Sequence, residues 1–442
     1  MQKILLLIAS LFYFNFILAE NEIKSWQGIH ETPLSRLEQQ FAEPPVEFAN
    51  HVIWGWEGKM DKKTICNDLD SIKKKGFRAV IFEAGYKLPF KYLSEEWFKA
   101  IRTGVLEAKK RGMKVWIIDE GKYPSGFAGG KFSQERPDLR MQALVIGDTI
   151  QIKRGEVMTN HKIAPEIISA VAVSTSGAPN RTVAINNGEI SFNAGLDDWK
   201  ILLVKSDFRT AVTRAVNNPN GGKDATNSLC DYLNPVAVQQ FIDWTHEQYK
   251  KYLGKELGTT VLGFRGDEPD YAHLPWTPSI VQTFKDTKGY DPTPYLASFF
   301  TTSPTIQEQR VKADYWDVWS SLFATHFFKL QADWCAANGV AHITHLNKEH
   351  EMPACVKAEG DYFRNLSKVQ IPGVDAIWNQ IWPGTLNDFP KLASSVAHVY
   401  GKPRAFSESF AAYHISPTIP QAKFVVDHQI ARGINFFEFM FW

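Results

Sequence analysis

Cysteine is scarce in this sequence: there are four in 442 residues, and no C-x-x-C pair occurs. This number is too small for a disulfide framework, and the missing pair argues against a zinc knuckle or a thioredoxin motif. The cysteines are Cys66, Cys230, Cys335 and Cys355. One bridge between Cys230 and Cys355 is conceivable, but we expect free buried thiols instead.

An excess of charge is also missing, because 49 Lys+Arg face 48 Asp+Glu, for a formal net charge of +1. Balanced charge gives no long-range field that would attract nucleic acid or an anionic membrane, so neither partner is expected. The chain contains no H-x-H, G-x-S-x-G, G-x-G-x-x-G or P-loop motif. These absences argue against a zinc or iron barrel hydrolase, a serine hydrolase and a nucleotide-binding protein.

Long apolar runs are absent beyond the first 19 residues. There, Lys3 precedes an apolar stretch over residues 4–18, and Ala19 is a small residue suited to cleavage, as in a secretory signal. The stretch is short for a membrane span and Asn15 interrupts it, although an uncleaved anchor is the alternative. We expect an exported protein, secreted or periplasmic, with no membrane span once residues 1–19 are removed.

Short apolar runs recur after residue 50, each followed by a loop and an amphipathic stretch. Near-continuous apolar runs are typical of parallel strands that are buried on both faces. The eight runs are HVIWGW at 51, FRAVIFEAG at 77, KVWIIDEG at 114, TVLGFRGDE at 260, AHITHLN at 341, VDAIWNQ at 374, RAFSES at 404 and INFFEFMFW at 434.

Helix signals lie between these runs. Ser94 is a plausible N-cap for a helix that ends before Gly112, and Asn234 followed by Pro235 opens another. A long helix is expected over residues 315–338, closed by Gly339. Eight strands that alternate with helices predict an α/β fold, a (β/α)8 TIM-type barrel.

The alternation of apolar runs and helix signals is interrupted over residues 140–225, which are rich in Val, Ile and Thr and contain Asn-Gly turns. We interpret this segment as a small β-rich domain inserted after the third strand. The expected organisation is a signal at 1–19, an N-terminal segment at 20–48, a first barrel part at 49–139, the insertion, and a second barrel part at 226–442. Because the last helix of a barrel is missing after the eighth strand, we expect a fragment of a longer protein with further C-terminal domains.

Carboxylates follow the predicted strands, where barrel enzymes place their active sites. Glycoside hydrolysis needs a pair of them. Glu268, before the turn forced by Pro269, is the first candidate, and Asp267 could orient it or hold a hydroxyl. Glu408 ends the seventh strand, opposite the fourth. For both glutamates the alternative is a structural, ion-paired acid. Other acids at strand ends are Glu57, Glu83, Asp119, Glu120, Glu349 and Glu351.

Several neighbouring loops could contact a sugar. The glycine-rich loop GKYPSGFAGG follows Asp119 and Glu120 and is either a sugar-binding loop or a tight turn. Polar residues crowd the loop after the fifth strand, where any two could bind a sugar hydroxyl, a Ca²⁺ ion or each other: His345, Asn347, Glu349, His350 and Glu351. Asp361 and Asp375 flank the sixth strand as ligands or simple caps.

Aromatic residues make up 13% of the chain, and seven lie near predicted strand ends. Aromatic rings stack on the C–H faces of sugars, and packing in the core or at the rim is the alternative. The seven are Trp54, Trp56, Tyr86, Tyr123, Trp276, Trp378 and Trp382.

Four segments resemble the secreted bacterial α-L-rhamnosidase glycoside hydrolases. They are residues 92–130, GFRGDEPDY at 263–271, GDYFRNLSKVQIPGVDAIW at 360–378, and SESFAAY followed by ARGINFFEF toward the end. The resemblance implies a barrel core within a larger enzyme that acts on plant or microbial poly- or oligosaccharide, with inversion and with Ca²⁺ holding the sugar.

In this resemblance Glu268 is the general acid and Glu408 the base, with Glu349 and Glu351 competing for the second role. The Asp-Glu-Pro sequence at 267–269 is also similar to the Asn-Glu-Pro of retaining barrel glycosidases, so the stereochemical outcome stays open. Two other functions are kept as alternatives: a non-catalytic carbohydrate-binding barrel and a polysaccharide lyase.

Overall fold

The computed structural model describes residues 33–121, 123–211, 213–214, 223–224, 227–271, 274–385, 387–413 and 417–440. The predicted signal at residues 1–19 lies outside these ranges. Among the described helices, none combines the length and the apolar character that crossing a bilayer requires.

Eight parallel strands close into a barrel, and each overlaps one of the eight predicted runs, although β16 begins at Ile371, before the run at 374. The order around the barrel is β1-β18-β17-β16-β15-β13-β3-β2, so the last strand pairs with the first. The predicted TIM-type barrel is therefore confirmed. The strands are β1 (His51–Trp56), β2 (Ala79–Ala84), β3 (Lys114–Ile118), β13 (Val261–Gly266), β15 (Ala341–Thr344), β16 (Ile371–Ala376), β17 (Phe406–Ser409) and β18 (Phe436–Phe439).

Alternate residues of each strand face opposite sides of the barrel wall. Ile53, Trp116 and Ile343 belong to a buried cluster in the barrel interior. Trp54 and Trp56 face outward, in the cluster that packs strands against α3 and α4. The barrel interior is therefore filled by side chains, and an open space is left only above them.

Two helices start at the N-caps that the sequence predicts. The Ser94 hydroxyl accepts a hydrogen bond from Trp97 N, and Asn234 Oδ1 accepts one from Val236 N. With these two, the helices include α3 (Lys62–Lys74), α4 (Glu95–Lys110), α5 (Lys131–Glu135), α6 (Pro235–Trp244), α7 (His246–Leu253), α8 (Ile280–Lys288), α11 (Met352–Glu359), α12 (Tyr362–Leu366), α13 (Pro390–Val399) and α14 (Ile419–Ile430).

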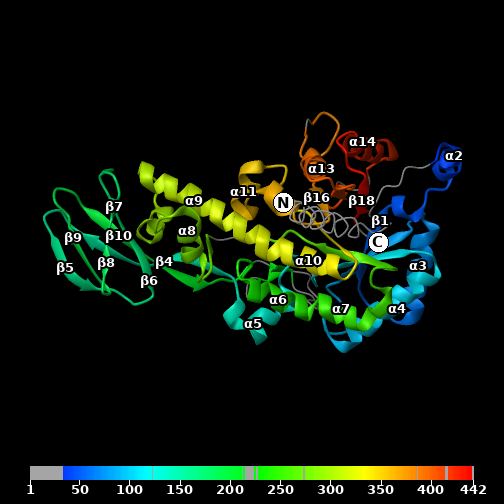
Figure 1. Ribbon diagram of the computed structural model, residues 1–442, viewed down its shortest axis with the longest axis horizontal. Coiled ribbons are helices and arrows are strands. Elements are labelled where there is room, and N and C mark those ends of the chain that lie inside the picture. Colours follow the sequence, from blue (N-terminus) through cyan, green and yellow to red (C-terminus); the bar gives the residue numbers. More distant parts are fainter. Residues whose placement is uncertain are drawn as a thin grey trace, which may run out of the picture.

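A β-rich part lies to one side of the barrel, at the left of Figure 1. Its largest sheet has the order β14-β4-β10-β6-β7, and β14 (Pro275–Trp276) comes from beyond the predicted insertion. A separate cluster that includes Trp199 and Phe192 forms its core. The other strands are β4 (Gln142–Ile152), β5 (Val157–Lys162), β6 (Ile167–Ser174), β7 (Arg181–Thr182), β8 (Ile185–Asn186), β9 (Glu189–Asn193), β10 (Trp199–Phe208), β11 (Thr213–Arg214) and β12 (Lys223–Asp224).

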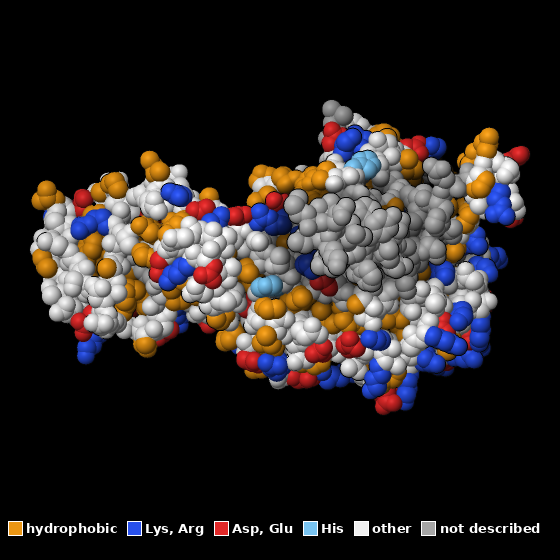
Figure 2. Space-filling view, viewed as in Figure 1, with side chains coloured by type: hydrophobic (Ala, Val, Ile, Leu, Met, Phe, Trp, Pro, Cys, Tyr) orange, Lys and Arg blue, Asp and Glu red, His pale blue; other side chains and the backbone are white. Residues whose placement is uncertain are grey.

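One long helical segment runs from the β-rich part to the barrel (Figure 1). It comprises α9 (Ile306–Leu322), a π-helical turn (Phe323–Phe328) and α10 (Lys329–Ala337). The helix begins earlier than the predicted residue 315 because Thr305 and Glu308 form a capping box. At the opposite end of the molecule, helix α2 (Leu34–Ala42) carries apolar side chains on the surface (Figure 2), with Leu34 and Phe41 each 86% exposed.

The cysteines match the expected state. All four are free, and Cys230, Cys335 and Cys355 are buried while Cys66 is partly buried.

Candidate active site

A cavity of about 430 Å³ opens at the carboxyl ends of the barrel strands. The inward-facing Ile53 and Ile118 line it, together with Met440 just after β18. Twelve of the sequence-predicted site residues meet in this cavity although they come from segments far apart in the chain. They are Glu83, Tyr86, Tyr123, Asp267, Glu268, His345, Asn347, Glu349, His350, Asp375, Trp378 and Glu408.

Glu268 lies two residues beyond β13, with a backbone φ of +37°. A positive φ is unusual for a residue with a β-carbon, and here it turns the chain directly before Pro269. Burial raises the pKa of Glu268 to about 8, while the positive charge of His345 opposes this shift and the negative charge of Asp267 adds to it. Burial therefore favours the protonated form of this carboxyl, which is the form that a general acid requires.

Arg265 is a site residue that the sequence reasoning missed. Its guanidinium is 1% exposed and pairs with Asp267 (2.6 Å), Glu438 (3.2 Å) and Glu408. Burial opposes the charge, but Asp267, Glu408 and Glu438 raise the pKa of Arg265 well above its ordinary value. An arginine inside an apolar strand, in GFRGDE, is the signal that could have identified it, because a buried cation needs carboxylate partners.

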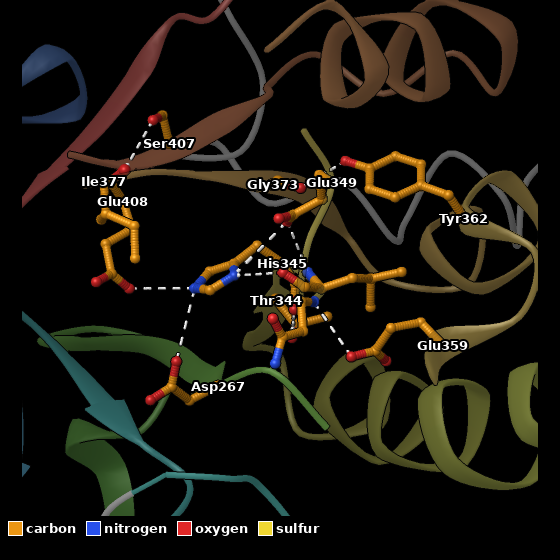
Figure 3. Close-up of polar contacts among 12 residues, drawn as sticks. Asp267, Thr344, His345, Glu349, Glu359, Tyr362, Gly373, Ile377, Ser407 and Glu408 are labelled. Carbon is orange, nitrogen blue, oxygen red and sulfur yellow. Dashed lines mark hydrogen bonds and ion pairs between the residues drawn. The ribbon is translucent and has the colours of Figure 1, made fainter. Parts of the chain in front are cut away.

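His345 links the carboxylates of the cavity (Figure 3). Its Nε2 lies 3.1 Å from Glu408 Oε2 and 3.6 Å from Asp267 Oδ1, and its Nδ1 lies 3.7 Å from Glu349 Oε1. Burial and the Arg265 charge lower the pKa of His345, but the hydrogen bond to Glu408 and the negative neighbours outweigh them and raise it to about 9. Glu408 is therefore held between the guanidinium of Arg265 and the imidazole of His345.

Glu349 and Asp375 are the remaining acids close to His345. Glu349 accepts a hydrogen bond from Leu346 N at 2.9 Å, and burial raises its pKa to about 7. Burial and the charges of Glu408 and Glu268 raise the pKa of Asp375 well above its usual range. Asp375 Oδ1 has no hydrogen-bond partner among the described residues.

The resemblance to the rhamnosidases implies a Ca²⁺ ion, and one group of donor atoms in the cavity could be considered as its site. Glu268, Asp375 and His345 bring one donor atom each within 4.8 Å of one another. Ca²⁺ takes six to eight oxygen ligands, whereas one of these three donors is a nitrogen. A cation here would also favour the ionised form of Glu268, the opposite of what a general acid needs. This group of residues therefore does not fit Ca²⁺.

Tyr123 and Asn347 form a polar wall of the cavity. Asn347 Nδ2 donates to the Tyr123 hydroxyl at 3.1 Å, and Asn347 N donates to Glu359 Oε1 at 3.1 Å. Glu359 is fully buried behind this wall, so it positions the loop rather than lining the cavity. Trp378 is 64% exposed at the rim, where its indole face is available to a ligand.

Trp54 and Trp56 do not contact this cavity, contrary to the expectation of sugar stacking. Trp56 is fully buried and Trp54 is 2% exposed, and their rings pack on each other and on Phe82. Their positions in β1 face the surrounding helices, whereas the preceding residue Ile53 faces the barrel interior and lines the cavity.

Asp119 and Glu120 are also fully buried and absent from the cavity wall. Glu120 accepts backbone hydrogen bonds from Gly121 (2.6 Å), Ala128 and Gly129 (2.9 Å). Asp119 Oδ1 accepts one from the Ser125 hydroxyl at 2.7 Å. Both acids therefore hold the glycine-rich loop in place, which corrects their expected contact with substrate.

Glu351 and Asp361 lie outside the cavity as well. Both are exposed and occupy N-cap positions, Glu351 before α11 and Asp361 before α12. The Asp361 carboxylate accepts a hydrogen bond from Arg364 N at 2.9 Å, so it is the simple cap that the sequence left as an alternative. Glu351 is thereby removed as a competitor for the second catalytic carboxylate.

A closed (β/α)8 barrel whose mouth holds a protonated and an ion-paired carboxylate has the features of the barrel glycoside hydrolases. A family model described as alpha-L-rhamnosidase, Glyco_hydro_106, matches residues 181–440, more than half of the 442 residues. The chain belongs to this glycoside hydrolase family.

Two relatives extend this result. A protein of Formosa agariphila named "Putative beta-glucuronidase" is 24% identical over 462 aligned positions, which cover 92% of this chain and 38% of that protein. The rhamnosidase structure from Novosphingobium sp. PP1Y has the same fold, with a TM-score of 0.69 at 15% identity, and the match covers 92% of this chain and 56% of that one. The chain thus spans roughly two fifths of the curated relative and somewhat over half of the solved one.

Proposed function

We propose that this chain is the catalytic barrel of an exported α-L-rhamnosidase-type glycoside hydrolase. The observation that carries the proposal is the pair of glutamates in one cavity: Glu268 with its pKa raised to about 8, and Glu408 ion-paired with Arg265. A carboxyl group that holds its proton and a second carboxyl group in the same site are the two groups that acid–base hydrolysis of a glycoside requires.

In the proposed reaction the Glu268 carboxyl gives its proton to the glycosidic oxygen as the bond from that oxygen to the anomeric carbon breaks. Water attacks the anomeric carbon from the opposite side. Glu408 takes the proton of this water, and Arg265 and His345 hold the carboxylate in position. One water is consumed, one C–O bond is formed and one is broken. The proposed outcome is inversion at the anomeric carbon.

The charges in the cavity favour a neutral sugar over a uronic acid. Six carboxyl groups line it, from Glu83, Asp267, Glu268, Glu349, Asp375 and Glu408. The guanidinium of Arg265 is already paired with three carboxylates, and a glucuronide carboxylate that bound this guanidinium would have to replace one of them. This argues against carrying the name of the Formosa relative over to this chain.

The cavity floor favours a deoxy sugar. Ile53, Ile118 and Met440 present apolar surface below the ring of acids. A rhamnose methyl group placed there would leave no polar atom unpaired, whereas the hydroxymethyl of a hexose would lack a hydrogen-bond partner on that surface.

A panel of aryl glycosides tests the proposal. We expect turnover of the aryl α-L-rhamnoside and at least about 100-fold lower kcat/KM for the aryl β-D-glucuronide, since a site loses this much when a charge is left unpaired. Binding of rhamnose without hydrolysis of any glycoside would favour the carbohydrate-binding barrel, and an unsaturated sugar product would favour the lyase. The anomeric form of the first product, read by NMR, tests inversion.

Export is the second part of the proposal and rests on Lys3, the apolar residues 4–18 and Ala19. Mass spectrometry of the mature N-terminus tests it. We expect a chain that starts just after Ala19 in the culture medium or the periplasm, and an intact Met1 in the cytoplasm would contradict it.

A further inference from the structure

A second cluster of chemically active side chains lies outside the cavity, between the barrel wall and two helices. His246 begins α7, Cys335 lies in α10, and His342 lies in β15. One donor atom of each lies within 4.8 Å of the other two, and all three residues are at most 1% exposed.

Three nitrogen atoms of this cluster have no hydrogen-bond partner among the described residues: His246 Nε2, His342 Nδ1 and His342 Nε2. An unpaired buried polar atom costs roughly 1–3 kcal/mol, so native proteins rarely keep several together without a ligand, an ion or water. The surroundings are apolar, since the His246 ring packs on Phe264 at 4.1 Å and edge-on to Trp334 at 5.1 Å.

The tautomer of His246 follows from its neighbour. The Thr245 hydroxyl donates its only proton to Phe241 O at 2.7 Å, so the contact of 2.9 Å between Thr245 Oγ1 and His246 Nδ1 needs the ring to donate. Nδ1 therefore carries the hydrogen, and Nε2 carries a free lone pair. A hydrogen bond that fixes the tautomer and the orientation of an imidazole in this way is typical of a metal-ligating histidine.

We infer that His246 Nε2, Cys335 Sγ and a ring nitrogen of His342 form a buried binding site for one thiophilic metal ion, zinc or copper. Two imidazoles and one thiol are the donors that these ions prefer, and calcium or magnesium would prefer oxygen. Ligands of one zinc ion lie about 2.0–2.3 Å from it, so side-chain shifts of about 1 Å would close the site. The thiol loses its proton to solvent when the metal–sulfur bond forms.

The site would connect the catalytic cavity to the outer helices. His342 and His345 lie three residues apart, His342 on the outer side of the barrel wall and His345 in the cavity. A metal ion would fix α7 and α10 to β15 and thereby steady the loop that carries His345. Cys335 itself stays protonated without metal, because burial raises the pKa of its thiol well above the usual value.

Elemental analysis tests the inference directly. The protein is expressed without a polyhistidine tag in medium that contains zinc and copper, then dialysed against metal-free buffer. We expect about one equivalent of zinc or copper per chain, and its loss in the Cys335→Ala and His342→Ala variants. Cys355→Ala is the matched control, because Cys355 is also a free and fully buried cysteine but lies outside the cluster.

A second readout covers variants that fail to fold. Protein refolded with Co²⁺ in place of the native ion should show a thiolate-to-cobalt charge-transfer band in the near ultraviolet, and Cys355→Ala should keep it. Parent protein without bound metal and without this band would overturn the inference. Equal metal content in folded Cys335→Ala would also overturn it, by showing adventitious binding only.

Discussion

Two neighbouring strands of the barrel are each followed by an Asp-Glu pair, but the two pairs have different surroundings. Asp119 and Glu120 follow β3, and Asp267 and Glu268 follow β13, its partner in the sheet. Glu120 is enclosed by three backbone amides of the glycine-rich loop, whereas Glu268 has a positive φ and lines the cavity. The loop that follows a strand, and not the acidic pair itself, thus decides whether the acids face a substrate.

The two pairs are linked through Ser125. Its hydroxyl donates to Asp119 Oδ1 at 2.7 Å and accepts from Asp267 N at 2.6 Å, and Ser125 N donates to Asp267 O at 2.8 Å. The buried pair therefore supports the backbone from which the cavity pair projects. We propose a structural role for Asp119 and Glu120 and a chemical role for Asp267 and Glu268, and variants at these positions separate the two roles.

The largest expected effect is the loss of activity in Glu268→Gln. Removing a general acid costs roughly 10²–10⁴-fold in rate. We expect a loss of this size in kcat, with the melting temperature unchanged or raised, because a buried ionisable group is removed. A steady-state assay and a thermal melt of the same sample measure both, and near-parent turnover would remove Glu268 from the mechanism.

Glu120→Gln should have the reverse effect: it should lower the stability of the protein and leave kcat nearly unchanged. A glutamine offers one acceptor oxygen to the amides of Gly121, Ala128 and Gly129, so at least one amide stays unpaired, at a cost of about 1–3 kcal/mol in the free energy of unfolding. Urea unfolding measures this loss. Below the melting temperature, kcat should stay close to that of the parent, and a loss of kcat as large as that of Glu268→Gln would erase the distinction between the two strand ends.

Substitution of the exposed Trp378 should have a smaller effect, which is seen in KM. Trp378→Ala should raise KM by roughly 2- to 12-fold with little change in kcat, since a stacked aromatic contact contributes about 0.5–1.5 kcal/mol. Trp56→Phe is the core control, expected to lower stability and leave KM unchanged. An unchanged KM in Trp378→Ala would show that the exposed indole does not contact substrate.

The smallest effect concerns the pH profile. Because the pKa of Glu268 is raised to about 8, the acid holds its proton below that pH, and kcat/KM should fall as pH rises through about 8. The negative charge of Asp267 contributes to the raised pKa, so Asp267→Asn should move this decline to lower pH. A decline that stays in place or moves upward would show that Asp267 does not act on Glu268 through its charge.

The barrel could be predicted from the sequence because its signals are local. Eight apolar runs, the Ser94 cap and the Asn234-Pro235 start each depend on neighbouring residues only. The cavity acids Glu268 and Glu408 could also be predicted, since the end of a barrel strand always faces the same side.

The errors arise where the direction of a side chain decides whether the residue lines the cavity. Trp54 and Trp56 were expected at the substrate because they lie near a strand end, but strand alternation turns them to the helices. The burial of Glu120 depends on the loop that brings the amides of residues 128 and 129 back to its carboxylate. The apolar pattern of a strand does not predict the path of that loop. Arg265 was missed because its partners Glu408 and Glu438 are distant in the chain.

The central claim is that Glu268 donates a proton to the leaving group, and leaving-group dependence tests it most directly. Parent and Glu268→Gln are compared on an α-L-rhamnoside of an unactivated alcohol and on one of a strongly acidic phenol, which departs without protonation. We predict that the variant loses most of its kcat/KM on the first substrate and little on the second. Equal losses on both substrates would contradict the account.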